Sequence, residues 1–387
     1  MKYDFDEVID RRGTDAIKWS TYPEDVIPLW VADMDFRSAE PIVRALQERA
    51  GHGVFGYTAA MKDLKRVLLE RLNALYRWPV KPEQVLFVPG VVTGLNVAIQ
   101  AYAEKGEGVL AQPPVYFHFL RDPVQHGRAL MDPPLVRRGD TYEIDFDRFE
   151  AAIAANTRIF ILCNPHNPVG RVFSQAELER IAEICLRHRL IICADEIHCD
   201  LVYSGCRHIP IATLSPEVAG STVTLMAPSK TYNIAGLECA YAMIPNKELR
   251  HRWQGISSGI VPGVGIMGYA AAFAALRDGE DWLQQVLSYL QDNRDFLAGY
   301  LGRNMPAIQM CRMEGTYLAW LDCLQAGIPG NPAEFFLREA RVGLNKGADF
   351  GQGGEGYVRL NFACPRKLLA AALDRMASAL AAHKHRK

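Results

Sequence analysis

Several apolar, strand-like runs in the sequence end in residues that could act on a small molecule. A glycine-opened turn at residues 89–94 leads into a helix-like segment, whose first N–H groups could bind an anion such as phosphate. Asn167 lies in the turn 164–170, where two Asn-Pro pairs favour an extended conformation that projects an amide side chain. Asp195 ends another apolar run, and a charge buried at the end of a strand needs a partner. Taken alone, the glycine turn also fits an ordinary connection.

Lys230 follows a further apolar run, at residues 223–226. A lysine in a loop is usually solvated, but desolvation beside a buried strand could lower its pKa toward that of a Schiff-base or general-base amine. A phosphate turn, an amide, a carboxylate and a lysine thus occur in this order along the chain. Pyridoxal 5′-phosphate (PLP) would use all four, because it carries a phosphate, a carbonyl for a lysine and a ring nitrogen that pairs with a carboxylate.

The elements that position these residues alternate between strands and helices from about residue 38 to residue 275. Ser38 and Pro41 are expected to open a helix that Gly51 or Gly53 ends, and a capping box at 174–177 predicts a helix through residue 186. Continuous apolar strands are expected at residues 85–88, 159–162, 190–194, 223–226 and 239–243. This pattern predicts a mostly parallel sheet covered on both faces, with ligands bound at the carboxyl ends of its strands.

After about residue 276 the pattern changes. A long helix is expected at 281–301, followed by strands and helices at 317–321, 334–340, 357–360 and 367–381. We therefore predict an N-terminal segment (1–45) that packs with the small domain, a large PLP-binding domain (46–275) and a small C-terminal α+β domain (276–387).

The composition narrows the class of protein. The 387 residues are 49% hydrophobic and carry 43 Lys+Arg against 44 Asp+Glu, a net charge of −1 that gives no electrostatic case for a nucleic-acid or anionic-membrane partner. No apolar run is long enough to span a bilayer, and the acidic N-terminus is unlike a signal peptide. Nine scattered cysteines without a C-x-x-C pair predict free thiols in the cytoplasm, and no zinc-ligand spacing indicates a metal site.

Several motifs extend this interpretation to a family. The motifs are Leu29-Trp-Val-Ala-Asp-Met-Asp-Phe36, Asn164-Pro-His-Asn-Pro-Val-Gly170, Asp195-Glu-Ile-His198, Ser229-Lys-Thr-Tyr-Asn-Ile-Ala-Gly236 and Tyr357-Val-Arg-Leu-Asn-Phe362. With them the whole chain resembles the fold-type I PLP enzymes of the aspartate aminotransferase superfamily. The first motif is typical of the cystathionine β-lyase or C–S lyase branch, of the MalY/PatB kind. The resemblance implies an α/β fold, with a mostly parallel seven-stranded sheet between helices and a smaller α+β domain.

The resemblance also implies roles around the cofactor ring. Lys230 would be the Schiff-base lysine, Asp195 the partner of the ring nitrogen and Asn167 the donor to the phenolic oxygen. Tyr116 would stack on the ring, although it also fits an ordinary core aromatic. His198 occupies the place where aminotransferases commonly have a tyrosine; a histidine is usual in the C–S lyase branch and favours lyase over transaminase, the alternative being a satisfied core histidine.

At the phosphate, the resemblance implies backbone N–H groups of Val91 and Val92 together with the Ser229 hydroxyl. Many aminotransferases have a phosphate-binding arginine eight residues after the lysine, where this chain has Glu238, so more of the binding is expected to fall to the other groups. Tyr57, between glycines in the segment 53–58, is expected to reach the phosphate of the neighbouring subunit of a homodimer. It also fits a simple surface turn.

For the substrate, the resemblance implies that Arg359 binds the α-carboxylate of an amino acid and that Ala32 lines the same subsite. A domain-domain salt bridge is the alternative for Arg359. The expected function is a PLP-dependent C–S β-lyase that converts L-cystathionine or a related cysteine S-conjugate to thiol, pyruvate and ammonia. A class I/II aminotransferase is the main alternative, and an additional regulatory protein-binding role is a minor one.

Overall fold

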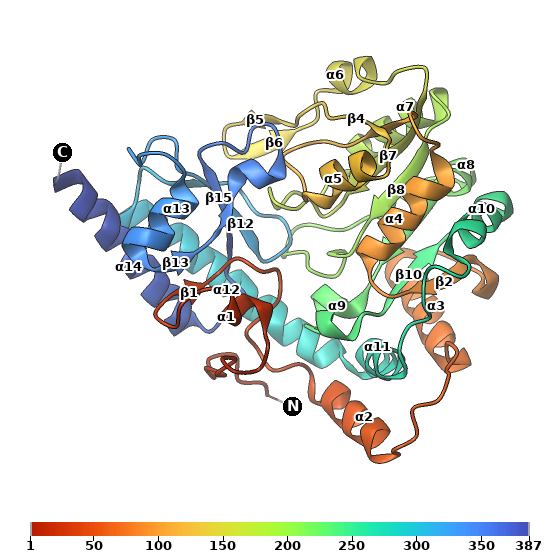
Figure 1. Cartoon of the computed structure of the whole chain (residues 1–387), viewed down its shortest axis with the longest axis horizontal. Coiled ribbons are helices and arrows are strands. Elements are labelled where there is room, and N and C mark those ends of the chain that lie inside the picture. Colours follow the sequence, from red (N-terminus) through yellow and green to blue (C-terminus); the bar gives the residue numbers. More distant parts are fainter. Residues whose placement is uncertain (1, 386–387) are drawn as a thin grey trace.

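A seven-stranded sheet forms the centre of the larger half of the computed structural model, which describes residues 2–385 (Figure 1). The strand order is β2-β10-β9-β8-β7-β3-β4. Pairs from β4 to β9 are parallel, and β10 is antiparallel to both β9 and β2. The strands are β2 (Val85–Val88), β3 (Gly108–Leu110), β4 (Ala129–Met131), β7 (Thr157–Cys163), β8 (Ile191–Asp195), β9 (Thr222–Met226) and β10 (Ala240–Met243). The predicted, mostly parallel seven-stranded sheet is confirmed.

Helices cover this sheet on both faces. On one face α4 packs against α10 and contacts β8, β9 and β10, burying Leu95, Ala98 and Trp253. On the other face α7 contributes Leu178 and Ile181 to a second apolar cluster. The helices of this half are α2 (Glu40–Gly51), α3 (Lys62–Tyr76), α4 (Val91–Tyr102), α5 (His118–Gln125), α6 (Phe146–Ala151), α7 (Gln175–Arg187), α8 (Pro216–Gly220), α9 (Pro228–Thr231), α10 (Lys247–Ser257) and α11 (Ile266–Asp278).

Two helix starts test the capping predictions. Ser174 and Glu177 form the predicted capping box at the start of α7. The helix expected to open at Ser38 and Pro41 and to end at Gly51 or Gly53 is α2, with Pro41 in its first turn, but its N-cap is Ala39 and not Ser38. The Ser38 hydroxyl donates instead to the backbone oxygen of Asn233, 3.0 Å away. A tertiary hydrogen bond therefore replaced the expected local cap.

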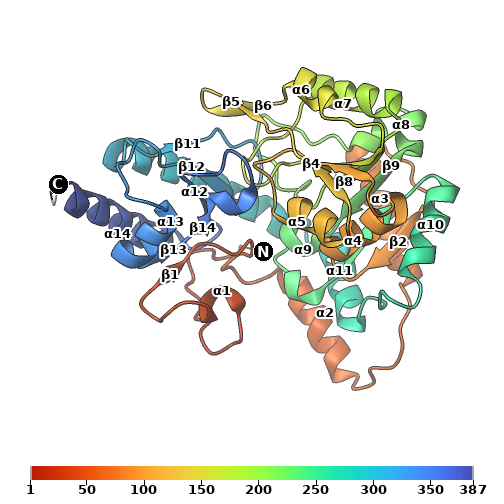
Figure 2. The same cartoon turned by 45° about the horizontal axis from the view of Figure 1, so that its top comes forward.

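A four-stranded antiparallel sheet forms the other half, in the order β11-β12-β15-β14. Its strands are β11 (Gln309–Met310), β12 (Leu318–Asp322), β14 (Asn345–Lys346) and β15 (Tyr357–Asn361), and its helices are α12 (Glu280–Asn304), α13 (Pro332–Phe335) and α14 (Arg366–His385). A hairpin of β5 (Val136–Arg138) and β6 (Thr141–Glu143) lies near β12 and β15. Figure 2 shows that α12 extends from the second half toward the first.

The N-terminal segment lies beside this second half, with α1 (Ile17–Ser20) close to β1 (Figures 1 and 2). β1 (Ile27–Pro28) pairs in parallel with β13 (Val342–Gly343), so residues far apart in the sequence share a small sheet. Lys18 and Asp35 form a buried ion pair of 2.6 Å that fixes the segment. The domain boundaries given above remain a prediction.

Among the described residues, no helix combines the length and apolar character of a membrane span. The nine cysteines are free thiols, eight of them buried, and Cys206 is exposed.

Candidate active site

A cavity of about 320 Å³ lies at the carboxyl ends of the parallel strands β7, β8 and β9, next to the start of α4. Its lining residues belong to the larger half of the molecule, apart from Ala32 of the N-terminal segment. The cavity brings together most of the residues predicted from the sequence: Ala32, Val91, Val92, Tyr116, Asn167, Asp195, His198, Ser229 and Lys230. Arg359 reaches the same place through Asn167, whereas Tyr57 is not among the lining residues.

Lys230 lies on α9, directly after β9, and its Nζ donates a hydrogen bond of 2.7 Å to the backbone oxygen of Ala32. Burial lowers the pKa of Lys230 to about 8, while the nearby Asp33 carboxylate opposes this shift. Part of the side chain stays open to the cavity. Lys230 thus offers an amine that is partly neutral near neutral pH, as a nucleophile or base requires.

Asp195 ends β8 and projects its carboxylate into the cavity. One oxygen accepts a hydrogen bond of 3.1 Å from the backbone N–H of Ile197. Burial raises the pKa of Asp195 to about 7, because no cation forms an ion pair with it among residues 2–385. This carboxylate would gain from a protonated ligand group beside it.

His198 lies three residues further along, only 2% exposed. Burial lowers the pKa of His198 to about 3, and the positive charges of Lys230 and Arg359 add to this effect, so its imidazole is neutral. Its Nδ1 has no hydrogen-bond partner among the described residues. A buried ring nitrogen without a partner is costly unless a ligand completes it, and the role of His198 at the cofactor stays a prediction.

Tyr116 is half-buried in the cavity wall, and its backbone N–H donates to the backbone oxygen of Asn167 at 3.1 Å. Its ring packs against Phe117 and Phe119, with ring centroids 4.6 and 6.2 Å away. Burial raises the pKa of Tyr116 to about 12, so the phenol is neutral. Tyr116 thus lines the cavity, and its stacking on the cofactor ring stays a prediction.

Arg359 is held in a fixed orientation by polar neighbours. Its NH1 donates to Asn167 Oδ1 at 2.9 Å, its NH2 to Asn345 Oδ1 at 2.6 Å and to the oxygen of Trp30 at 3.1 Å. Its guanidinium also lies over the ring of Phe350, 4.8 Å from the centroid. No carboxylate pairs with it among residues 2–385, so the predicted alternative of a domain-domain salt bridge is not found. Burial lowers the pKa of Arg359 to about 10.

The start of α4 forms another wall of the cavity. Its N-cap, Gly90, has φ of 93°, and no side chain caps this end of the helix. The first-turn N–H groups of Val91 and Val92 are therefore available to an anion, with Ser229 on the same wall. Glu238 is exposed and lines both this cavity and an adjoining hollow of about 490 Å³ beside Val92.

Residues 30–36 form a strap that borders the cavity at Ala32 and is held by side chains from both halves of the molecule. Asn361 donates to the oxygens of Val31 and Asp33, and Asn233 donates to those of Met34 and Phe36. The Ala32 oxygen accepts from Lys230 and also from the Tyr317 hydroxyl, at 2.7 and 2.9 Å. The sequence interpretation missed the roles of Asn233, Asn361 and Tyr317, although the first two lie inside the quoted motifs.

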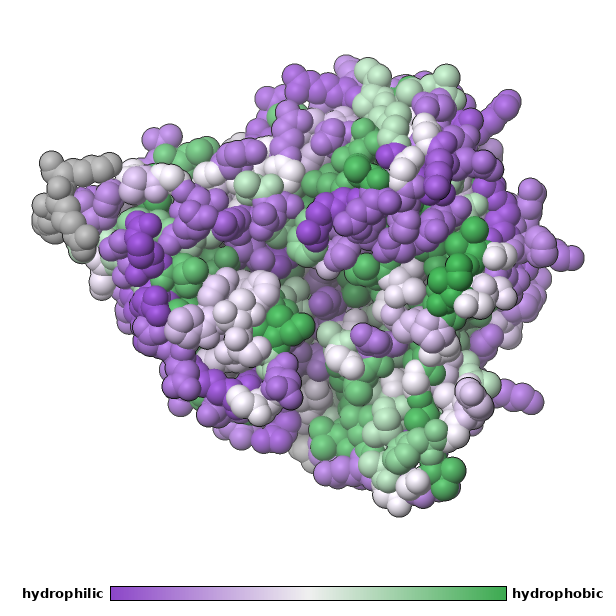
Figure 3. Space-filling view, viewed as in Figure 1, coloured by the Kyte–Doolittle hydropathy of each residue, from purple (hydrophilic) through white to green (hydrophobic). Residues whose placement is uncertain are grey.

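Tyr57 lies in the extended, exposed segment between α2 and α3, away from the cavity of its own chain. Val54, Phe55 and Ile260 are also large apolar residues with exposed side chains. Figure 3 shows apolar side chains gathered at the lower right of this face, where Figure 1 places α2 and the segment after it.

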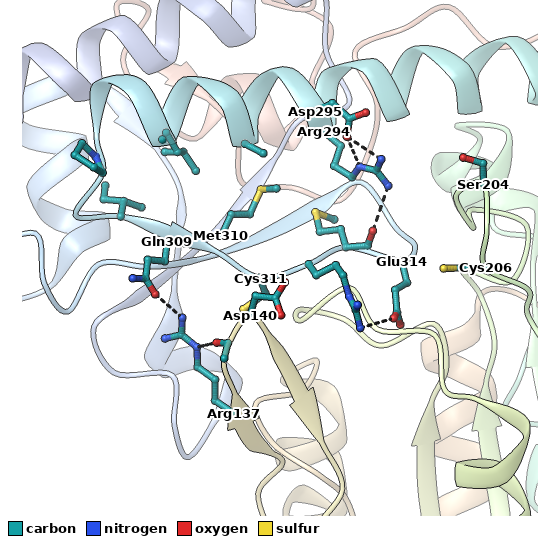
Figure 4. Close-up of a pocket in the computed structure, with 18 residues that line it drawn as sticks. Arg137, Asp140, Ser204, Cys206, Arg294, Asp295, Gln309, Met310, Cys311 and Glu314 are labelled. Carbon is teal, nitrogen blue, oxygen red and sulfur yellow. Dashed lines mark hydrogen bonds and ion pairs between the residues drawn. The ribbon is translucent and has the colours of Figure 1, made fainter.

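A larger hollow of about 890 Å³ lies elsewhere, between α12, β11 and the β5–β6 hairpin (Figure 4). The three arginines that line it are already paired: Arg137 with Asp322, Arg294 with Asp295, and Arg312 with Glu314. None of the predicted site residues lines it. The smaller cavity is therefore the candidate active site.

Comparison with known proteins identifies the family. The pattern of the aminotransferase class I and II family matches residues 24–376. The chain belongs to this family. Cystathionine β-lyase PatB of Bacillus subtilis (strain 168) is 38% identical over 97% of this chain and 99% of its own length. The solved structure of OvoB has a TM-score of 0.94 and 43% identity, over 98% of this chain and 99% of that one. The PLP-bound C–S lyase of Staphylococcus hominis has a TM-score of 0.93 and 32% identity, over 98% of each chain.

Proposed function

We propose that this aminotransferase-family protein is a PLP-dependent C–S β-lyase that cleaves L-cystathionine or a related cysteine S-conjugate to a thiol, pyruvate and ammonia. The observation that carries the proposal is the joint placement of Lys230, Asp195 and the unpartnered His198 in one cavity. The names of the relatives support the reaction type, since PatB is a cystathionine β-lyase and the Staphylococcus hominis protein a PLP-bound C–S lyase.

The cavity fits PLP group by group. The uncapped start of α4 and Ser229 suit the phosphate, and the aromatic face of Tyr116 suits the ring. Asp195, whose pKa is raised to about 7 by burial, suits a protonated ring nitrogen. His198 Nδ1 lacks a partner that a polar group of the cofactor or substrate would supply. Lys230 is the amine available for covalent attachment.

The chain's own groups then divide the work on the substrate. When bound, PLP supplies an electron sink for the bond broken at the substrate Cα. Arg359 holds the α-carboxylate with its guanidinium, whose NH1 has one N–H not bonded to a protein acceptor, and this contact orients the Cα–H bond. Lys230 takes the Cα proton as a neutral amine, which its lowered pKa of about 8 makes available. The electron pair left on the substrate forms a Cα–Cβ double bond as the thiolate departs from Cβ.

An aminotransferase is the second candidate, because the family comprises class I and II aminotransferases. It would use the same Lys230, Asp195 and Arg359, and would return the proton to the cofactor side instead of expelling a β group. His198 in the place of the usual tyrosine supports the lyase. The two candidates differ in what they release from L-cystathionine.

Product analysis tests the proposal. Incubation of the holoenzyme with L-cystathionine should release homocysteine, pyruvate and ammonia in equal amounts, and Lys230→Ala should release none of them above background. Borohydride reduction of the holoenzyme followed by peptide mapping should place the cofactor on Lys230. Release of pyruvate without thiol, or a label on another lysine, would contradict the assignment.

We also propose that the protein acts in the cytoplasm as a homodimer that shares its active sites. Free thiols throughout the chain support a reducing compartment. The exposed Val54, Phe55 and Tyr57 support contact with a second copy, because large apolar side chains gather on this segment. In a two-fold dimer, Tyr57 of each subunit would complete the phosphate end of the other site.

A further inference from the structure

Tyr317 is a buried tyrosine that no step above has used. It directly precedes β12, is 0% exposed, and its hydroxyl donates 2.9 Å to the Ala32 oxygen. Lys230 donates to the same oxygen, at 2.7 Å. A carbonyl oxygen has two lone pairs, so Tyr317 and Lys230 together fill its accepting capacity and fix its direction.

The position of Ala32 makes this shared acceptor more than a packing detail. Ala32 lies in the strap, whose neighbouring carbonyls are already held by Asn361 and Asn233. Those bonds keep the strap in place without Tyr317. Tyr317 therefore acts on one peptide group, the one that receives the amine of Lys230.

We propose that Tyr317 is a positioning residue for proton transfer: it orients the Ala32 carbonyl, which holds the amine of Lys230 whenever that amine is not bonded to the cofactor. The inference rests on the proposed role of Lys230. In the transfer, the Cα–H bond breaks, the proton moves to Lys230 Nζ and makes an ammonium, and the electron pair stays on the substrate. An oriented carbonyl stabilises this ammonium and keeps its N–H directed at one place.

The electrostatics of Tyr317 agree with a permanent donor. Burial raises the pKa of Tyr317, and the Asp33 carboxylate adds to the rise, so its hydroxyl keeps its proton. The ring contacts His198 edge-on, with centroids 6.0 Å apart. Tyr317 thus sits behind two cavity residues without lining the cavity itself.

The chain offers a matched control. Tyr203 is also buried, and its hydroxyl donates 2.5 Å to the backbone oxygen of Thr316, directly before Tyr317. Tyr317→Phe and Tyr203→Phe each remove one phenol hydroxyl and one bond to a backbone carbonyl. They differ in whether that carbonyl also holds Lys230.

The first test follows exchange of the Cα hydrogen of L-alanine in D₂O by NMR, using the holoenzyme. Tyr317→Phe should slow exchange at saturating L-alanine by about five- to tenfold, the effect of one buried hydrogen bond, while the L-alanine concentration for half-saturation stays within about twofold. Tyr203→Phe should exchange at the wild-type rate. The proposal would be overturned if both variants lost the same exchange rate, if Tyr317→Phe lost none, or if only the L-alanine concentration for half-saturation changed.

The second test does not depend on activity. N-phosphopyridoxyl-L-alanine is a non-reactive adduct that leaves the amine of Lys230 free, and its crystal complex with the wild-type protein should show Nζ within hydrogen-bond distance of the Ala32 oxygen. In Tyr317→Phe that contact should be lost or the Ala32 peptide rotated. Nζ directed elsewhere in the wild type, or unchanged geometry in the variant, would refute it. L-alanine has no β leaving group, so its exchange does not depend on C–S cleavage. If the proposed lyase function were wrong, L-cystathionine would yield no pyruvate while the exchange of L-alanine stayed intact.

Discussion

Replacing Arg359 by lysine should raise the KM for an amino-acid substrate far more than it lowers kcat. The guanidinium is planar and is held by Asn167, Asn345 and the Trp30 oxygen, and a substrate carboxylate that takes the place of one of these acceptors can accept two parallel N–H bonds. Lysine keeps the charge but presents one point donor. Loss of one hydrogen bond to a charged partner costs about 1.5–3 kcal/mol, which corresponds to a KM increase of roughly 10- to 150-fold.

The assay compares ligands with and without the carboxylate. Inhibition constants for L-alanine and for ethylamine are measured in the wild type, in Arg359→Lys and in Arg341→Lys, an exposed arginine paired with Asp25. Only the affinity of Arg359→Lys for L-alanine should fall. Ethylamine has no carboxylate, and Arg341 lies away from the cavity. The assignment of Arg359 to the α-carboxylate would be refuted if the inhibition constant for L-alanine stayed within about twofold of wild type, or if both ligands lost affinity equally.

Four further outcomes are expected. Lys230→Ala should keep PLP without a covalent bond and lose several orders of magnitude in turnover; more than about a tenth of wild-type turnover would place the base elsewhere. In the PLP-free protein, Lys230 should capture added PLP at a rate that rises about tenfold per pH unit up to about pH 8 and then levels off, because burial lowers its pKa from 10.5 to about 8. A rate that keeps rising toward pH 10 would show an ordinary lysine. Mixing inactive Tyr57→Phe and Lys230→Ala subunits should restore activity in heterodimers, and no recovery despite subunit exchange would exclude shared sites. Lys18→Ala should lower the free energy of unfolding by about 3 kcal/mol in urea titrations, because it leaves Asp35 buried with less compensation, and a change below about 1 kcal/mol would contradict this.

The strands that carry the site could be predicted because their sequences are continuous apolar runs. β7, β8 and β9 each lie within two residues of the expected limits, so Asp195 and Lys230 were placed at strand ends from the pattern alone. β3 and β4 were not predicted. They are three-residue strands, and β4, at the sheet edge, has no fully buried residue, so a run of this length does not stand out from a loop.

The contacts of the site were harder to predict, since they join residues far apart in the sequence. Tyr317 and Lys230 meet at Ala32, which is 285 residues before the first and 198 before the second. Ser38 shows the same limit, because its hydroxyl bonds to Asn233 instead of capping α2. Local pattern fixes elements, whereas such hydrogen bonds depend on how the two halves of the molecule pack.

The number of pyruvate molecules that one active site releases from L-cystathionine without any 2-oxo acid tests the central claim most directly. A lyase regenerates its cofactor in each cycle, so the C–S lyase account predicts many pyruvates and equal homocysteine per site at a steady rate. An aminotransferase would stop after at most one turnover, with its cofactor converted to the pyridoxamine form. Such an arrest, relieved by adding a 2-oxo acid, would contradict the proposal.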